Sequence, residues 1–291
     1  MDSELCAEVS PGRHGRLSQR RKRTARTLVF TDDYPLADSQ NSEPRFTPRQ
    51  AVGHRLKARG LSFDDLRVGK KVLLTWSRLW GEAMADALGA VPVPQTMFID
   101  TFWLKTANND QGGISVAFAP IGAPGTIMLL EDLIACGAES IVGVGASGGL
   151  NRDHPVGDVL LPDVCRIIDE GTTAHYPDAD PPTADGELLA GLTSLLEKHG
   201  GRTASGDWWT TDGFYREMTD DIARHIANGI LGIDMETSAM YRVARLRGIA
   251  ACNMLIVSDE LWTDWNYGID FSEFKSGEAA MQAAAVEWAQ S

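Results

Sequence analysis

From about residue 68 onward, short apolar runs alternate with amphipathic stretches, and this alternation constrains the fold more than any other feature of the chain. Strands are predicted at 71–76, 114–120, 158–162 and 251–257, and a strand that runs into a glycine loop is predicted at 140–150. Helices are predicted at 77–90, 125–138, 185–201, 236–248 and 276–290. Strands that alternate with helices predict an α/β fold: a mixed, mostly parallel central sheet flanked by helices on both faces. In such sheets ligands bind beyond the carboxyl ends of the strands.

Residues 1–45 differ from the rest of the chain because they are polar and carry basic and then acidic patches. This composition predicts a flexible polar extension, and residues 46–291 are expected to form a single α/β domain. Arg20 and Arg21 stand side by side, but no apolar stretch follows them, so we do not expect an export signal.

The net charge of −13 argues against a nucleic-acid partner, although a small anionic substrate can still bind in a local basic pocket. No apolar run approaches the roughly 20 residues of a membrane span, so no membrane partner is expected. Cys6, Cys136, Cys165 and Cys252 lie far apart, which predicts neither a metal site nor a disulfide framework. We therefore expect a reducing, cytoplasmic setting.

The first candidate segment is "GVGASGGL", which follows a predicted strand. A glycine loop such as Gly145–Gly149 lets backbone N–H groups approach an anion or a sugar. Taken alone, the segment is better explained as a tight turn.

The second candidate segment, "GDWWTTDGFYRE" (206–217), is predicted to be a loop with two adjacent tryptophans. A flat aromatic face stacks well on a heterocyclic base, and Asp212 and Arg216 are placed to bond base edges or each other. The plainer interpretation makes one tryptophan a core residue and the other a rim contact. We expect at least one of them to lie in the core.

The third candidate segment, 232–262, places Asp234, Glu236 and Asp259 beside apolar runs. Buried acids cost free energy unless they are paired, hydrogen-bonded or used in catalysis. Glu236 stands at the N-terminus of a predicted helix, where a carboxylate can hold a ribose diol, and Asp259 follows a strand, where it can donate a proton to a leaving base. Taken singly, a helix cap and a turn residue are the simpler interpretations.

Together these segments resemble the nucleoside phosphorylase/nucleosidase family, which includes purine nucleoside phosphorylases, uridine phosphorylases and methylthioadenosine nucleosidases. "DMETSAMY" resembles the family's "EMEA" signature, and "VSDE" (257–260) looks like the "SD" that carries the acid in purine-cleaving members. "GVGASGGLNRDHPVGDVLLPD" is similar to the family's glycine loop and next strand, and "TASGDWWTTDGFYRE" takes the place of its base-binding loop.

The resemblance implies a three-layer α/β/α fold and cleavage of a nucleoside N-glycosidic bond, with a purine-type base favoured. Asp259 would act as the catalytic acid, Met235 would pack on the ribose and Glu236 would hold its hydroxyls. Asp234 would orient this loop. The implied nucleoside-binding residues are Trp208, Trp209, Asp212, Arg216, Met235, Glu236 and Ser258. The family also implies a homo-oligomer and no cofactor or metal.

The second substrate is open at this point. Phosphorolytic relatives carry an arginine where this chain has Gly143, and a Ser or Thr where it has Ala146. Arg78, Gly145 and Ser147 are the remaining phosphate candidates, although the family's "GDP" before the arginine is missing. Nucleosidases use a glutamate to activate water, and none stands in "LTWSRLW" (74–80). Phosphorolysis with inorganic phosphate as co-substrate is therefore favoured. A hydrolytic nucleosidase and a non-catalytic nucleoside-binding protein are the alternatives.

Overall fold

The computed structural model describes residues 44–66, 68–93, 103–107, 113–176, 178–262 and 264–291. Residues 1–43, which make up most of the predicted polar extension, lie outside the described part of the chain. Residues 44–291 belong to one compact unit.

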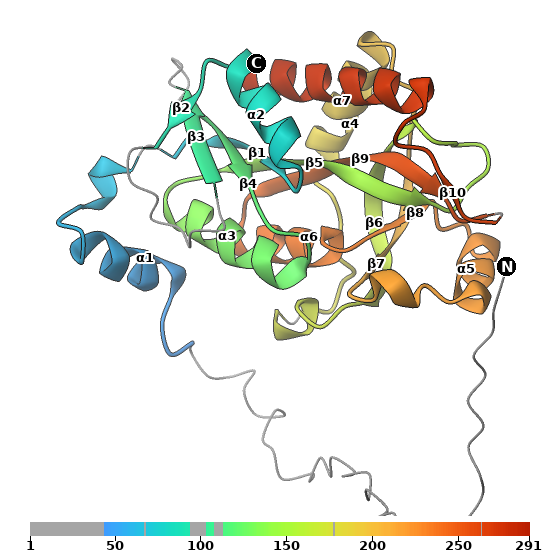
Figure 1. The fold of residues 1–291 in the computed structure, drawn as a ribbon. Coiled ribbons are helices and arrows are strands. Elements are labelled where there is room, and N and C mark those ends of the chain that lie inside the picture. The colour runs from blue at the N-terminus through green and yellow to red at the C-terminus, as the bar shows by residue number, and fades with distance from the viewer. Residues whose placement is uncertain (1–43, 67, 94–102, 108–112, 177, 263) are drawn as a thin grey trace, which may run out of the picture. The chain divides into compact units, whose positions relative to one another are not determined.

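In the described part of the chain, ten strands form one sheet in the order β10-β9-β6-β7-β8-β5-β1-β4-β3-β2 (Figure 1). Their bounds are β1 Lys71–Thr75, β2 Val91–Pro92, β3 Trp103–Ala107, β4 Ile114–Phe118, β5 Ser140–Gly149, β6 Val159–Asp169, β7 Thr203–Thr211, β8 Gly232–Asp234, β9 Ala250–Glu260 and β10 Asn266–Tyr267. The strands β4, β1, β5 and β9 pair in parallel and are largely buried.

Helices cover both faces of this sheet. Helices α2, α4 and α7 lie on one face, α3 and α6 lie on the other, and α1 packs outside α3 (Figure 1). The bounds are α1 Pro48–Lys57, α2 Arg78–Ala87, α3 Ala123–Ala135, α4 Gly186–Lys198, α5 Thr219–Ala227, α6 Thr237–Arg247 and α7 Ser272–Gln290, with short 3-10 turns at Phe63–Asp65, Thr173–His175 and Phe214–Arg216. The predicted α/β class with a flanked, mostly parallel sheet is confirmed.

Strand β5 changes neighbours along one of its edges, and this change shapes the molecule. It pairs with β1 as far as Val144 and with β8 from Gly148 onward. Along its other edge β5 pairs with β9 over its whole length. Because β9 also pairs with β6, the strands β5, β9, β6, β7 and β8 close into a ring. The edge of β5 at 145–147 has no strand partner among the described residues.

Two predictions from the sequence were wrong in detail. The expected glycine loop at Gly145–Gly149 is the end of β5, because β9 and then β8 pair with it. The expected loop around Trp208 is β7, which pairs with β6 and β8. Its polar threonines are compatible with a buried strand because Thr210 and Thr211 donate hydrogen bonds to Asp234 and Asp169. No helix in the described part of the chain has the length and apolar character that crossing a membrane requires.

Helix α7 approaches the segment after β5 so closely that only glycine fits. A Cβ on Gly277 would lie 1.9 Å from the carbonyl oxygen of Gly157, which itself has a φ of +95°. This contact fixes the loop between β5 and β6 against the helix.

We expect Gly277→Ala to destabilise the protein by about 1–3 kcal/mol because the new methyl group overpacks a backbone contact. Gly191→Ala in α4 is the matched control, since nothing lies within 4 Å of its added Cβ. That control should be neutral or stabilising by up to about 1 kcal/mol. Urea unfolding of the two variants measures the difference, and equal stabilities would contradict the proposed contact.

Candidate active site

The carboxylate of Asp234 is the anchor of the site. Its Oδ1 accepts hydrogen bonds from Trp208 Nε1 (3.0 Å) and Thr210 Oγ1 (2.9 Å) of β7. Its Oδ2 accepts from the backbone N–H (2.9 Å) and hydroxyl (2.5 Å) of Thr237 at the start of α6. Asn253 of β9 in turn donates to the Thr237 hydroxyl at 2.7 Å. The expectation that Asp234 orients this loop therefore has a structural basis.

Glu236 stands at the N-cap position of α6, but its side chain does not cap the helix. It is buried, and its Oε1 accepts a hydrogen bond of 2.5 Å from the backbone N–H of Gly122, the residue before α3. Burial, and next the charge of Asp234, raise the pKa of Glu236 to about 8. Near neutral pH the carboxyl is therefore largely protonated in the free protein, and it can both donate and accept hydrogen bonds.

Asp259 lies at the end of β9, beside a bulge. The β5–β9 register shifts so that Ser147 faces Val257 and Gly148 faces Asp259. Bulges of this kind commonly re-aim side chains next to active sites. Asp259 Oδ1 accepts from Ser258 Oγ at 2.7 Å and Oδ2 accepts from Trp265 Nε1 at 2.9 Å.

The hydroxyl of Ser258 can serve both protonation states of Asp259. It lies 2.7 Å from Asp259 Oδ1 and 3.1 Å from the carbonyl oxygen of Ser147. A hydroxyl rotates and carries one proton. It donates to the carboxylate when Asp259 is charged, and it can accept from a neutral Asp259 while donating to Ser147.

The two segments that carry the acids flank the end of β5. Gly148 pairs with Ile233 of β8 on one side and with Asp259 of β9 on the other. Adjacent strands lie about 4.8 Å apart, so the backbones that lead to Glu236 and Asp259 are roughly 10 Å apart. Only glycine fits at position 148 between these strands, because a Cβ there would lie 2.8 Å from side-chain atoms of Ile233 and Leu261.

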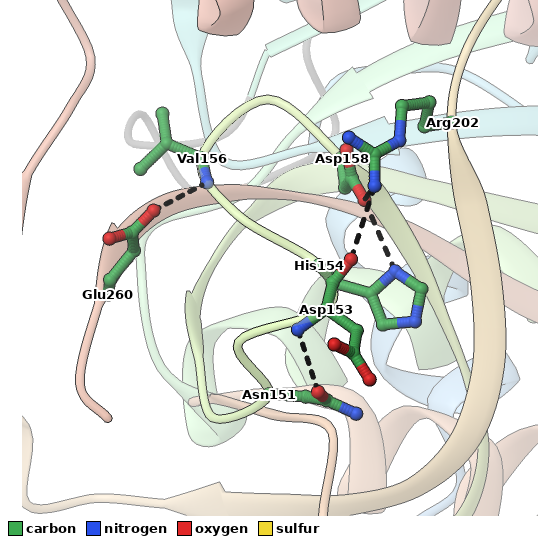
Figure 2. Close-up of polar contacts among 7 residues, drawn as sticks. All are labelled: Asn151, Asp153, His154, Val156, Asp158, Arg202 and Glu260. Atoms are coloured by element: carbon green, nitrogen blue, oxygen red, sulfur yellow. Dashed lines mark hydrogen bonds and ion pairs between the residues drawn. The ribbon is translucent and has the colours of Figure 1, made fainter. Parts of the chain in front are cut away.

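Glu260 ties the acid-bearing end of β9 to the loop that follows β5. Its Oε1 accepts from the backbone N–H of Val156 at 3.1 Å, and its Oε2 accepts from Asn266 Nδ2 of β10 at 3.0 Å. Figure 2 shows the Val156 contact beside the group in which Asp158 meets His154 and Arg202. Glu260 therefore ties the end of β9 to the loop after β5 and to β10.

The tryptophan pair is more deeply buried than expected. Trp208 is 0% exposed and donates its ring N–H to Asp234. It therefore has no exposed face with which to border a base, contrary to the expectation from the sequence. Trp209 is 3% exposed and packs with Leu150, Ile230 and Ile233, its ring 4.6 Å from that of His225. The expectation of at least one core tryptophan is confirmed, and neither ring offers an open face.

The other nucleoside candidates are scattered around the ring. Met235 is half-buried between Asp234 and Glu236. Asp212 is exposed and accepts a 3.0 Å hydrogen bond from the backbone N–H of Gly171. Arg216 is exposed in its 3-10 turn, and among the described residues no ion pair joins it to Asp212.

The phosphate candidates do not form one cluster. Arg78 is the first residue of α2, its side chain is 69% exposed, and its Nε lies 3.8 Å from Glu82 Oε1. Ser147 is buried, and its Oγ has no hydrogen-bond partner within the described part of the chain. Gly145 is covered by Trp76, since a Cβ on it would lie 2.8 Å from the indole ring.

Two side chains fill the space beside Gly143. A Cβ on this residue would lie 2.0 Å from Asn253 Oδ1 and 3.1 Å from the ring of Trp76. The Trp76 N–H donates to Thr126 Oγ1 of α3 at 2.7 Å. An arginine at position 143 is therefore excluded by packing.

Sequence reasoning missed Glu217, which follows the Phe214–Arg216 turn. Burial, with a further contribution from the charge of Asp259, raises its pKa to about 7. The sequence showed only an ordinary acid at the end of a polar segment, because the signal lies in its proximity to β9. In the described residues, no group of His, Cys, Asp and Glu side chains is arranged to hold a metal ion.

Comparison with known proteins assigns the family. The sequence pattern of the phosphorylase superfamily matches residues 85–289. The chain therefore belongs to the phosphorylase superfamily.

Two curated relatives match the same length of chain. The DeoD-type purine nucleoside phosphorylase of Bacillus cereus (strain B4264) is 30% identical over 152 residues, which is 52% of this chain and 65% of the relative. The DeoD-type enzyme of Bacillus mycoides (strain KBAB4) is 29% identical over 152 residues, with the same coverage. The chain thus spans 65% of the length of these relatives.

Solved structures confirm the fold. A purine nucleoside phosphorylase from Toxoplasma gondii, in complex with immucillin-H, matches with a TM-score of 0.68 and 23% identity over 79% of this chain and 94% of that one. A uridine phosphorylase from Vibrio fischeri ES114, complexed with 6-hydroxy-1-naphthoic acid, matches with a TM-score of 0.67 and 24% identity over 78% and 94%.

The raised pKa of Glu236 makes stability depend on pH. Between the usual value of 4.5 and about 8, the unfolded chain has lost this proton while the folded chain retains it. Stability therefore falls as pH rises through this window. We expect the melting temperature of Glu236→Gln, relative to that of wild type, to rise from pH 5 to pH 8. Glu187→Gln, at an exposed position in α4, should follow wild type, and parallel curves for all three proteins would refute the assignment.

Proposed function

We propose that this protein cleaves the N-glycosidic bond of a nucleoside, with a purine-type base favoured, and releases the free base. The observation that carries the proposal is that β8, which leads to Glu236, and β9, which carries Asp259, flank the end of β5 at Gly148. Strands on opposite edges of β5 can present one acid to the sugar and the other to the base of one nucleoside. The names of the curated relatives support the same reaction class.

In this proposal the C1′–N bond breaks, its electron pair stays with the base, and positive charge develops on the sugar. Glu236 holds the sugar hydroxyls from its buried position next to Gly122, and Met235 packs on the ribose. Asp259 delivers a proton to the leaving base, and the hydroxyl of Ser258 then donates its hydrogen bond to the resulting carboxylate. Groups aimed at developing charge in a site of low polarity are effective because they need no reorganisation.

Inorganic phosphate is the proposed second substrate, and ribose 1-phosphate is the second product. A phosphate oxygen would form the new bond to C1′. Support comes from the buried, unpartnered hydroxyl of Ser147 in the described structure and from the relatives, which are phosphorylases by name. Arg78, which lies 3.8 Å from Glu82, and Arg216 are both exposed cations, and either would supply the charge that phosphate requires.

Hydrolysis is the second candidate, and one observation favours it. Asn253 and Trp76 fill the space beside Gly143, and the ring of Trp76 also lies on Gly145. This stretch of β5 therefore offers no positive side chain in the described structure. Water needs no such charge, so a nucleosidase would tolerate this packing.

The acid role of Asp259 predicts a specific kinetic loss. Asp259→Asn should lower kcat on inosine or adenosine by about 10²-fold or more, with a smaller change in KM, because an amide cannot donate this proton. Asp264→Asn, at an exposed position between β9 and β10, is the control. Chromatography of the released base measures both rates. Full turnover by Asp259→Asn would remove Asp259 from the mechanism.

The sugar role of Glu236 predicts a dependence on the 2′-hydroxyl. Glu236→Gln should reduce kcat/KM for ribonucleosides more than for 2′-deoxyribonucleosides, because the deoxy sugar has one contact fewer to lose. The ratio of the two losses measures this contribution. An equal loss on both substrates would indicate that Glu236 serves the structure only.

The identity of the nucleophile is tested by removing phosphate. If phosphate attacks, wild type should need it and yield ribose 1-phosphate, and Arg78→Ala should raise its KM. Lys57→Ala, an exposed cation on α1, should leave this KM unchanged. Free ribose formed at an undiminished rate in phosphate-free buffer would instead establish hydrolysis.

A further inference from the structure

Two large aromatic side chains remain exposed beside the acid end of β9. Trp265 is 66% exposed and Tyr267 is 51% exposed. Their ring centroids lie 5.5 Å apart, with the planes tilted by 40°. Exposed aromatic groups that lie together commonly mark a binding surface, because their apolar area is otherwise left in water.

This pair is held in place by the backbone of β10. Strand β10 runs antiparallel to β9, with Tyr267 opposite Asp259 and Asn266 opposite Glu260. The carboxylate of Glu260 bonds both Asn266 and the backbone of Val156, the latter contact being visible in Figure 2. The aromatic pair therefore sits on a braced segment, which limits the ordering that a ligand would have to impose.

The ring of Trp265 is joined directly to Asp259. Its Nε1 donates to Asp259 Oδ2 at 2.9 Å, while Ser258 serves Oδ1. The indole edge is thus fixed next to the carboxyl group, while two thirds of the side chain remains exposed, at 66%. Trp208 and Trp209, by contrast, are buried and have no face to offer.

We propose that Trp265 receives the leaving base, stacking one indole face on the planar heterocycle while its N–H holds Asp259 Oδ2 and leaves Oδ1 to exchange the proton. This inference rests on the proposed function of Asp259. The ligand class is a flat aromatic heterocycle with a proton-accepting nitrogen at its edge. A bicyclic purine overlaps an indole more fully than a single ring does, which agrees with the purine preference proposed above.

Binding of the free base tests the stacking role without requiring catalysis. Calorimetric titration of the full chain with hypoxanthine and with adenine should show Trp265→Leu weakening the Kd by about fivefold to 150-fold, the range for one aromatic stack. Trp265→Phe keeps a ring and should stay within about threefold of wild type. Phe46→Leu, an exposed ring before α1, is the matched control and should not differ from wild type.

Kinetics with inosine and adenosine test the second contact of the same side chain. Trp265→Phe removes the N–H, so its kcat should fall and the pH profile of kcat should shift while base affinity stays close to wild type. A purely structural role for Trp265 would leave that profile unmoved.

Two results would overturn the inference: a Kd for Trp265→Leu equal to that of wild type, or no binding of either base by wild type. Nucleoside cleavage that needs Asp259 but not Trp265 would support the proposed function and contradict the role inferred for Trp265. Base binding that needs Trp265, without any cleavage of nucleosides, would remove the proposed function and keep only the stacking of a heterocycle on Trp265.

Discussion

The hydrogen bonds to Asp234 are the interaction on which the rest of the site depends. Four donors from β7 and the start of α6 converge on this one buried carboxyl group. Burial raises its pKa, and the donors oppose that shift. A buried acid is tolerable only when such donors replace water. The arrangement fixes Met235 and Glu236, which follow Asp234 directly, relative to the strand that carries the tryptophans.

The site lies where β5 changes neighbours. Strand β1 leaves at Val144 and β8 joins at Gly148, so the short gap between them exposes one edge of the chain within the sheet. Crevices at such changes of strand order are where open α/β sheets bind ligands. Here the closure of five strands into a ring adds the end of β9 on the opposite edge of β5. The two candidate acids, Glu236 and Asp259, thus follow or belong to two different neighbours of one strand.

Much of the fold and the acids of the site were predictable from sequence. The buried strands and amphipathic helices carried clear periodic signals, and Asp234, Glu236 and Asp259 stood out because acids are rare beside such apolar runs. Strand β7 was not predictable, because its threonines read as a polar loop until the partners Asp169 and Asp234 are known.

The contacts between distant segments were equally hidden from the sequence. The packing of Trp76 and Asn253 beside Gly143 joins segments far apart in the chain, and so does the effect of Asp259 on Glu217. The sequence does not distinguish Trp265, which is exposed, from the seven other tryptophans. Its exposure follows from the pairing of β10 with β9. Composition and spacing describe local structure, whereas these contacts depend on how the ring closes.

The protonation of Glu236 links sugar binding to the proposed chemistry. With a pKa of about 8 in the free protein, this carboxyl is close to the midpoint of its titration at physiological pH. In the proposed reaction, sugar hydroxyls that donate to it would favour the charged form, so binding of a nucleoside would release a proton to solvent and leave a carboxylate beside the sugar. Negative charge would then be in place before the C1′–N bond stretches and positive charge develops on the ribose. In the free site the same charge would lie buried beside Asp234 with only backbone N–H groups such as that of Gly122 to offset it, so the neutral form is favoured.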